Sequence, residues 1–212
     1  MNKKEFKIIN LFKIARPYQW VKNILVFLPM LMSHSFDTTT LVLSIKGFII
    51  FSIVASSIYI INDIVDLEAD QNHLYKKNRP LAAGLVNINQ CKYFIILLLS
   101  LSFLFLFDSN INFIFLIFSY FIVSNAYSFI FKKYVIIDLI ILASLYTLRI
   151  IGGALITDIS LSIWLLSFSV FFFLSLAAIK RQIEIINAKK LKKKKITGRG
   201  YILEDKKIIN MI

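Results

Sequence analysis

Long apolar runs recur along the chain and are separated by short polar stretches. A helix that crosses a hydrocarbon core about 30 Å thick needs roughly 20 residues. One run, residues 21–32, is shorter than this length and contains Pro29, so we expect it either to cross the membrane or to be re-entrant. No strand periodicity is evident, and the pattern predicts an all-α, polytopic transmembrane helical bundle with about six spans. The other five runs come close to the length of a span or exceed it, at residues 41–61, 93–107, 111–131, 135–156 and 161–179.

The loops between these runs differ in charge on the two sides of the predicted membrane. If the N-terminus lies inside, the inner loops each contain at least two Lys or Arg, whereas the outer loops contain none. This asymmetry predicts a multi-pass protein of the cell inner (cytoplasmic) membrane with a cytoplasmic N-terminus. Lys46, near the outer end of the second span, is the exception, and we expect its amine to snorkel to the membrane surface. The inner loops are residues 62–92, 132–133 and 180 onward, and the outer loops are about 33–40, 108–110 and 157–160.

The two ends of the chain are predicted to be basic cytoplasmic segments. Residues 1–22 combine Lys and Arg with apolar residues at helical spacing, which indicates an amphipathic interfacial segment. Residues 23–188 form the predicted transmembrane helical domain, and its cytoplasmic loop at residues 62–92 carries the candidate active site. Residues 189–212 are predicted to be a basic loop, with lysines at 189–195 that contact anionic lipid and the start of a further helix at 208–212.

Composition excludes several classes of protein. With 58% hydrophobic residues and a mean hydropathy of +0.74, a soluble fold is ruled out. The 25 Lys and Arg against 12 Asp and Glu give a net charge of +13. In a membrane protein this excess is typical of contacts with anionic lipids or phosphates, and no nucleic-acid partner is expected. Cys91 is the one cysteine, so an intramolecular disulfide and a thiolate metal cluster are excluded. A homo-oligomer is compatible with the sequence.

Four acidic residues lie within nine positions directly after the second span. If the helix continues, steps of about 100° per residue place Asn62 and three aspartates within one arc, and Glu68 on the far side. Three carboxylates on one face repel each other unless a cation lies between them, so a solvated acidic helix end is the less favoured interpretation. Mg²⁺ prefers such oxygen ligands together with phosphate oxygens. The sequence therefore predicts a Mg²⁺ site with catalytic aspartates, formed by Asn62, Asp63, Asp66 and Asp70.

A basic loop follows the acidic motif, with Lys76, Lys77 and Arg79 before Pro80. Basic residues near an acidic metal site suit a diphosphate, because the metal neutralises only part of its charge. On their own, Lys76 and Lys77 are more typical of a positively charged inside loop, and Arg79 is the more specific candidate. We predict that Lys76 and Arg79, with Asn62, bind substrate.

These motifs resemble those of the UbiA superfamily of intramembrane prenyltransferases. Residues 62–84 read N-D-x-x-D-x-x-x-D and then N-R-P-L-A-A-G, like the first aspartate-rich motif and the loop after it. Residues 16–23, R-P-Y-Q-W-V-K-N, resemble the opening of the decaprenyl-phosphate phosphoribosyltransferase branch, as do residues 127–138 and 148–153. Substrate-binding roles are thereby implied for Arg16, Lys22, Asn23 and Lys132.

The resemblance also implies a fold and its dimensions. It implies a helical bundle around a central cavity, with the active site at the cytoplasmic side and a lateral opening to lipid. Because the superfamily has about nine spans, we expect that about three of its helices are absent from this chain.

The segment after the last predicted span, residues 161–179, distinguishes two kinds of substrate. Prenyltransferases of this superfamily have a second aspartate-rich segment here, whereas this chain has Lys180, Arg181 and Glu184 on one helix face. The phosphoribosyltransferase branch has a similar K-R-x-x-E segment, which implies that these residues bind substrate phosphates. The alternative is that the two cations only anchor a helix end.

Arg149 lies deep in the fifth predicted span, where a guanidinium is costly in lipid. We predict that it faces a polar cavity and binds substrate, or else that it pairs with an acid of another helix. Asp138, nearer the inner end of the same span, fits either role.

The resemblance implies Mg²⁺-dependent transfer of a phosphoribosyl group from phosphoribosyl diphosphate to a polyprenyl (decaprenyl-type) phosphate, with release of diphosphate, in cell envelope biosynthesis. Mg²⁺ is then the cofactor, and the partners are the diphosphate donor, the lipid phosphate acceptor and membrane lipids. One alternative is a UbiA-like prenyltransferase that moves a polyprenyl group from its diphosphate to an aromatic or other small acceptor. A second alternative is an inactive truncated chain.

Overall fold

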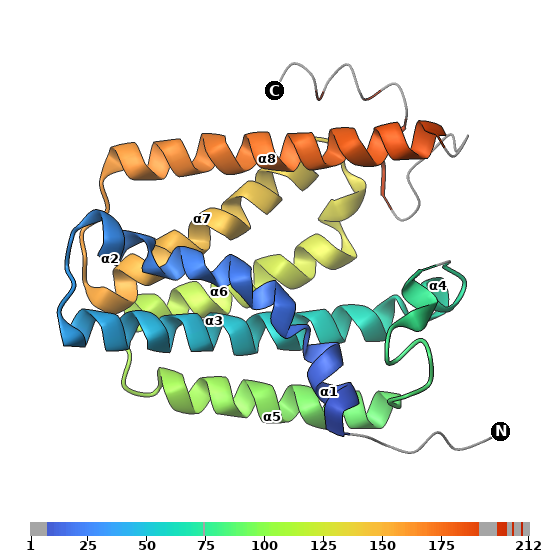
Figure 1. Cartoon of the computed structure of the whole chain (residues 1–212), viewed down its shortest axis with the longest axis horizontal. Coiled ribbons are helices and arrows are strands. Elements are labelled where there is room, and N and C mark those ends of the chain that lie inside the picture. The colour runs from blue at the N-terminus through green and yellow to red at the C-terminus, as the bar shows by residue number, and fades with distance from the viewer. Residues whose placement is uncertain (1–7, 74, 191–198, 203–204, 206–208, 210–212) are drawn as a thin grey trace.

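The computed structural model of the chain describes residues 8–73, 75–190, 199–202, 205 and 209 (Figure 1). The predicted helix start at 208–212, residue 209 apart, and most of the lysine run at 189–195 lie outside the described residues. Every regular element in the described part is a helix. In chain order these are α1 (Ile8–Ala15), η1 (Pro17–Phe27), α2 (Leu28–Met32), α3 (Thr38–Val65), α4 (Leu67–Gln71), η2 (Lys76–Asn78), α5 (Ile88–Leu106), α6 (Ile111–Phe129), η3 (Phe131–Lys133), α7 (Ile137–Thr157) and α8 (Ile163–Lys190).

Within the described part of the chain, five helices are long and apolar enough to cross a membrane, namely α3, α5, α6, α7 and α8. They coincide with five of the predicted spans, and the all-α bundle is confirmed. In Figure 1, α8 lies along one side of the bundle and α5 along the opposite side, with α3, α6 and α7 between them. Because α3 and α7 are the most buried of the five, the core forms around them, with Phe51, Phe113 and Tyr120 at its centre.

The first predicted span, the short run at residues 21–32, differs from the other five in the structure as well. Residues 17–32 form the 3₁₀ helix η1 and the short helix α2, neither of which is a spanning helix of the usual kind. A 3₁₀ helix rises about 2.0 Å per residue, against about 1.5 Å in an α-helix. The 11 residues of η1 and the 5 of α2 therefore extend together over about 30 Å, the thickness of a hydrocarbon core.

The stretched helix η1 packs in register against α3. Its rise over three residues, about 6 Å, equals the rise of an α-helix over four residues. Trp20 and Asn23, three residues apart, accordingly bond to serines four residues apart. Trp20 Nε1 donates to Ser56 Oγ at 3.0 Å, and Asn23 Nδ2 donates to Ser52 Oγ at 3.0 Å. This repeat fixes Asn23, and Lys22 beside it, at the inner side of the bundle.

The helices η1 and α7 approach each other closely at Val26 and Gly153. A Cβ atom at Gly153 would collide with the backbone carbonyl of Val26, so this approach requires glycine. Gly152 in the same way leaves room for the ring of Phe51. The two glycines, which belong to a motif singled out in the sequence, therefore have a packing role and bring η1 close to Arg149, one turn earlier on α7.

The loops gather at two ends of the bundle. One end holds α4, η2, η3 and the C-terminal part of α8, which belong to the three predicted inner segments (Figure 1). At the other end, Asp37 and Asn110 accept hydrogen bonds from the first turns of α3 and α6. Lys46 also reaches an acid at this end, since its amine lies 2.5 Å from Asp108 Oδ1. The fold thus brings the predicted inner segments together and gives Lys46 an ionic partner.

Candidate functional site

The acidic motif lies where α3 ends, and the helix does not continue through the motif as predicted from the sequence. α3 stops at Val65, Asp66 forms a turn, and α4 begins at Leu67. Asp63 and Asp70 are buried, whereas 35% of the Asp66 side chain is exposed. The single acidic face predicted from a continuous helix is therefore divided, with two aspartates inside the protein and Asp66 at the surface of the site.

Arginines from two other segments bind the buried aspartates. Arg79 Nη1 donates to Asp63 Oδ1 at 3.1 Å and to Asp70 Oδ2 at 2.5 Å. Arg16, between α1 and η1, also donates to Asp63 Oδ1. Arg16 has a positive φ of 53°, which turns the chain from one helix into the next. The structure thus brings together four predicted site residues from three separate segments.

Asp66 faces a second group of cations. Lys132 Nζ lies 3.4 Å from Asp66 Oδ2, and Lys76 Nζ lies 3.7 Å from Asp70 Oδ1. These side chains line a cavity of about 200 Å³ at the loop end of the bundle. We call it the loop cavity, and its lining residues are Asp66, Ala69, Asp70, His73, Lys76, Lys132 and Arg199.

The predicted Mg²⁺ ligands do not form a ready-made metal site. In the described part of the chain, no three acidic, His or Cys side chains are grouped closely enough to hold an ion. Asn62 Oδ1 and Asp70 Oδ1 are nevertheless buried oxygens that accept no hydrogen bond from the described residues. Because Mg²⁺ is often bound by one or two carboxylates plus substrate phosphates, these oxygen donors fit an ion that arrives with a diphosphate.

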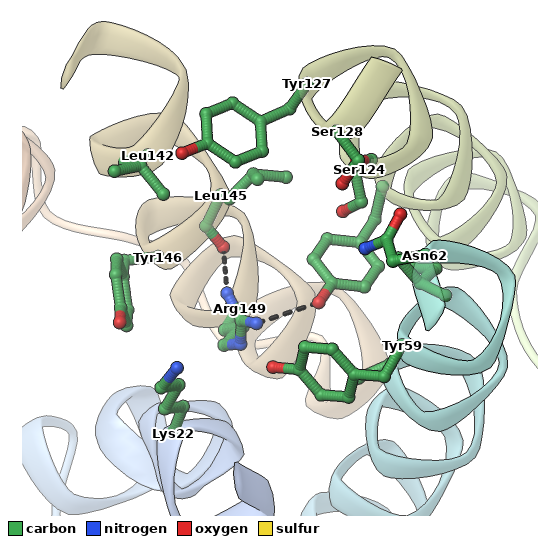
Figure 2. Close-up of a pocket in the computed structure, with 13 residues that line it drawn as sticks. Lys22, Tyr59, Asn62, Ser124, Tyr127, Ser128, Leu142, Leu145, Tyr146 and Arg149 are labelled. Carbon is green, nitrogen blue, oxygen red and sulfur yellow. Dashed lines mark hydrogen bonds between the residues drawn. The ribbon is translucent and has the colours of Figure 1, made fainter. Parts of the chain in front are cut away.

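A second cavity, of about 160 Å³, lies inside the bundle next to Asn62 (Figure 2). We call it the central cavity. Its charged residues are Lys22 and Arg149, and the described lining includes no carboxylate. Figure 2 shows the Lys22 amine and the Tyr59 hydroxyl directed toward Arg149. The remaining polar lining comes from α6 and α7 and consists of Tyr120, Ser124, Tyr127, Ser128 and Tyr146.

Arg149 is buried in α7 and held by neutral partners. Its Nε donates to Asn23 Oδ1 at 2.8 Å, its Nη2 to Tyr120 OH at 2.8 Å, and its Nη1 to the Leu145 carbonyl. Its guanidinium also lies 5.1 and 5.3 Å from the ring centroids of Tyr120 and Tyr146. None of its contacts within the described residues is an acid, so the cavity-lining alternative fits and the acid-paired alternative does not.

Lys180 lies close to the same cavity. It lines a neighbouring space of about 130 Å³, which shares Leu142 and Tyr146 with the central cavity. Its charge is also near enough to interact with that of Lys22. Three predicted substrate-binding cations, Lys22, Arg149 and Lys180, therefore converge from η1, α7 and α8.

Arg181 lies in an internal ion-pair cluster, and its predicted contact with substrate stays a prediction. Its side chain is fully buried, and its Nε and Nη2 both donate to the Asp138 carboxylate, the latter at 3.0 Å. Its Nη1 donates to Glu184 Oε2 at 2.7 Å. Tyr201 OH donates to Asp138 Oδ2 at 3.0 Å, and burial raises the pKa of this phenol, which keeps it protonated. We call this the Asp138 cluster, and within it both Arg181 and Glu184 are occupied by internal ion pairs.

Sequence reasoning missed two groups of residues. The first is the polar stripe of α6, where Tyr120, Ser124, Tyr127 and Ser128 recur at helical spacing inside an apolar span. That signal was present in the sequence. The second is Arg199, which donates to Asp138 Oδ1 and Tyr127 OH at 3.0 Å each. Its spacing within the basic C-terminal region does not distinguish it from its neighbours, and only the fold reveals its position.

Comparison with known families settles the ancestry of this chain. The UbiA prenyltransferase family matches residues 24–195, which include the acidic turn and the helices α3, α6 and α7 beside the central cavity. The chain belongs to the UbiA prenyltransferase family. Together with its five long apolar helices, this membership makes it an integral membrane protein of a transferase family.

Curated relatives carry different names. The chain is 37% identical over 191 residues to the protein y4nM of Sinorhizobium fredii, covering 90% of this chain and 37% of that protein. It is 32% identical to the nodulation protein NoeC of Azorhizobium caulinodans, covering 93% and 64%. It is 34% identical to the decaprenyl-phosphate phosphoribosyltransferase of Mycolicibacterium smegmatis, covering 84% and 58%. The chain therefore spans less than two thirds of the length of each.

Solved structures share the fold. A UbiA homolog from Archaeoglobus fulgidus bound to DMAPP and Mg²⁺ has a TM-score of 0.69 and 20% identity, covering 85% of this chain and 66% of that one. The homolog bound to GPP and Mg²⁺ has a TM-score of 0.73 and 19% identity, covering 94% and 71%. At this level of identity the likeness shows a common helical architecture.

Proposed function

We propose that this UbiA-family chain takes part in Mg²⁺-dependent transfer of a phosphoribosyl group from phosphoribosyl diphosphate to a polyprenyl phosphate, with release of diphosphate. The observation that carries the proposal is the central cavity, which presents Lys22 and Arg149 and no described carboxylate beside the acidic turn. The relative named decaprenyl-phosphate phosphoribosyltransferase supports the same reaction.

The number of anionic groups distinguishes this reaction from prenyl transfer. A phosphoribosyl transfer must hold the donor's diphosphate and also the phosphate of the lipid acceptor. The chain offers two separate groups of cations: Lys76, Lys132 and Arg79 around the acidic turn, and Lys22 with Arg149 in the central cavity. A prenyl transfer to a neutral acceptor requires only the first group, so the second favours the phosphoribosyl reaction.

In the proposed site, Asp66 is the aspartate most accessible to a Mg²⁺ ion, with Asn62 and Asp70 supplying the oxygens that lack a hydrogen-bond partner. When bound, the metal would neutralise charge on the departing diphosphate. Asp63 remains tied to Arg16 and Arg79, and its proposed role is to hold these guanidinium groups beside the donor. Arg79 and Lys76 then bind phosphate oxygens.

The central cavity is the proposed place of the acceptor phosphate. A lipid phosphate is already anionic near neutral pH, so it needs to be oriented rather than deprotonated. Lys22 and Arg149 can hold its oxygens, while Asn23 and Tyr120 fix the guanidinium of Arg149 in advance. The described lining contains no His or Cys, which agrees with a reaction that needs no general base there.

Two other functions stay as alternatives. The solved relatives bound to prenyl diphosphates favour a prenyltransferase, which would use the acidic turn and leave the cations of the central cavity without a substrate. The second alternative is that the chain is inactive. The chain covers 58% of the length of the phosphoribosyltransferase relative. Association into a homo-oligomer is compatible with all three functions.

We also propose that the chain lies in the inner membrane with the loop cavity facing the cytoplasm, because the loops at that end contain the Lys and Arg. In a Cys91→Ser background, cysteines introduced at Asp158 and Lys133 test this orientation. An impermeant thiol reagent applied outside should label position 158 and spare position 133. Labelling of position 133 from outside would reverse the orientation.

The test of the reaction is transfer of label from radioactive phosphoribosyl diphosphate to polyprenyl phosphate in membranes containing the chain. Asp66→Asn should abolish the product, because the metal site loses its exposed carboxylate. Lys132→Ala should lower turnover about 10-fold or more, the size of one charge-assisted contact. Lys133→Ala, the exposed neighbour on the same turn, is the control and should match the parent. Equal loss in both lysine variants would argue against a specific phosphate contact.

A further inference from the structure

Arg199 lies in a short segment that folds back against the ends of α6 and α7. Gly200 packs on the backbone carbonyl of Lys133, where a Cβ atom would collide. Tyr201 is fully buried, with its hydroxyl on Asp138. The position of Arg199 is therefore set by the two residues that follow it, and its side chain is directed to the region between the two cavities.

The contacts of Arg199 are shared with another arginine. Its Nη1 lies 3.0 Å from Asp138 Oδ1, and its Nε lies 3.4 Å from Glu184 Oε2. Arg181 already binds both acids, Asp138 through two nitrogens and Glu184 at 2.7 Å. If the Arg199 side chain moved away from these acids, each acid would still be paired with Arg181. The ion pairs of Arg199 are therefore replaceable, whereas those of Arg181 hold the buried cluster.

Arg199 also differs from Arg181 in what it can reach. Its side chain is 22% exposed, against 0% for Arg181, and it lines the loop cavity with Asp66 and Lys132. Its hydrogen-bond partner Tyr127 lines the central cavity. A single guanidinium thus contacts the walls of both cavities, at the place where a donor bound in the loop cavity would meet an acceptor bound in the central cavity.

We propose that Arg199 is a further substrate-binding residue, whose guanidinium binds diphosphate oxygens in the loop cavity. The inference rests on the proposed function, because it assigns the loop cavity to the donor's diphosphate. Lys132 in the same cavity faces Asp66, whereas the two acids next to Arg199 have Arg181 as a second partner. A planar guanidinium offers paired N–H donors to phosphate oxygens, so Arg199 can move from carboxylate to phosphate at little cost.

Binding of inorganic diphosphate tests this directly and does not depend on turnover. The full chain is purified in detergent with Mg²⁺, and diphosphate is titrated by calorimetry. Arg199→Gln should weaken diphosphate binding about 10- to 100-fold, the effect of one charge-assisted hydrogen bond. Lys189→Gln, which removes an exposed cation from the end of α8, is the charge-matched control and should leave the affinity within about twofold of the parent.

A second measurement needs no substitution and so remains valid if Arg199→Gln fails to fold. The parent chain is treated with phenylglyoxal, an arginine reagent, with and without Mg²⁺ and diphosphate, and the modified peptides are quantified. Diphosphate should protect Arg199, whereas Arg181 should stay unmodified in both samples because it is buried.

The outcomes separate this inference from the proposed function. Diphosphate binding that is lost in Lys132→Ala but unchanged in Arg199→Gln, with Arg199 unprotected, would overturn the inference and leave the donor site standing. Failure of the parent chain to bind diphosphate with Mg²⁺ would overturn the donor site, and the assignment of Arg199 with it.

Discussion

Arg149 and Arg181 are both guanidinium groups buried in long apolar helices, but they are stabilised in different ways. Arg181 is bound by two carboxylates and a tyrosine hydroxyl, and no part of it is exposed. Arg149 is bound by an amide, a hydroxyl and a carbonyl, and it faces a cavity. The first has its charge neutralised inside the protein, whereas the second keeps a positive charge available for a ligand.

This contrast separates structural cations from candidate ligand-binding cations in a membrane protein. A buried charge is costly unless it is paired, so a buried arginine without an acid partner indicates a ligand-binding site. Among the described residues no acid pairs with Arg149, which lies with Lys22 in one cavity, so an anion is the expected ligand. Substitutions of the two arginines should therefore affect different measurements.

The largest effect is expected for Arg181→Ala. Removing this side chain takes the bidentate partner from the fully buried Asp138, so the free energy of unfolding should fall by about 3–5 kcal/mol. Denaturant unfolding in detergent measures it. Lys180→Ala, one residue earlier and exposed, is the control and should change the same quantity little. A loss below about 1 kcal/mol for Arg181→Ala would mean that the Asp138 cluster is not what stabilises this end of the bundle.

The next effect concerns the close contact that brings η1 to α7. Gly153→Ala places a methyl group against the Val26 carbonyl and should lower the free energy of unfolding by about 1–3 kcal/mol. Because η1 carries Asn23, the partner of Arg149, anion binding should weaken as well. Ser144→Ala, on an exposed position of α7, is the control for the helix itself. Unchanged stability would show that η1 can move away freely.

Arg149→Gln should have a smaller effect on stability and a larger one on ligand binding. Its neutral partners face a cavity where water can replace the lost hydrogen bonds, so the unfolding free energy should change by about 1 kcal/mol. The affinity for farnesyl phosphate, measured by calorimetry, should fall by about 1.5–3 kcal/mol. Destabilisation as large as that of Arg181→Ala, with unchanged phosphate affinity, would place the two arginines in one structural class.

The smallest effect is expected for the exposed ion pair at the other end of the bundle. The hydrogen bond from Lys46 holds the pKa of Asp108 below its ordinary value of 3.8. A carboxyl whose folded pKa is lowered stabilises the fold above its unfolded pKa, and this contribution is lost as pH falls through the folded pKa. Between pH 5 and 3, the thermal unfolding temperature should therefore fall slightly more with decreasing pH in the parent than in Asp108→Asn. Identical profiles would show no contribution from the pair.

The spans could be predicted from the sequence because apolar length alone determines which helices can cross a membrane. The form of residues 17–32 could not, since the 3₁₀ geometry of η1 depends on its match to serines of α3. Periodicity also placed Lys180 and Arg181 on one face, yet adjacent residues on a helix are about 100° apart. Whether each then reaches a cavity or a buried acid is decided by packing against α7, which the sequence does not reveal.

The acidic turn shows the same limit. The motif identified the aspartates, but the assumed continuous helix breaks at Asp66, and Arg16 and Arg79 arrive from segments distant in sequence. Arg199 was missed for a related reason, because its place depends on the burial of Tyr201. Motifs identify the chemistry of a site, whereas the pairing of its charges is a property of the folded chain.

The choice of donor distinguishes phosphoribosyl transfer from prenyl transfer. Membranes containing the chain are supplied in parallel with labelled phosphoribosyl diphosphate plus polyprenyl phosphate, and with labelled prenyl diphosphate plus an aromatic acceptor, each with Mg²⁺. We expect a labelled lipid product from the first pair alone, and its loss in Arg149→Gln. Product from the second pair alone would contradict it, because a site that uses only one diphosphate has no need of the cations in the central cavity.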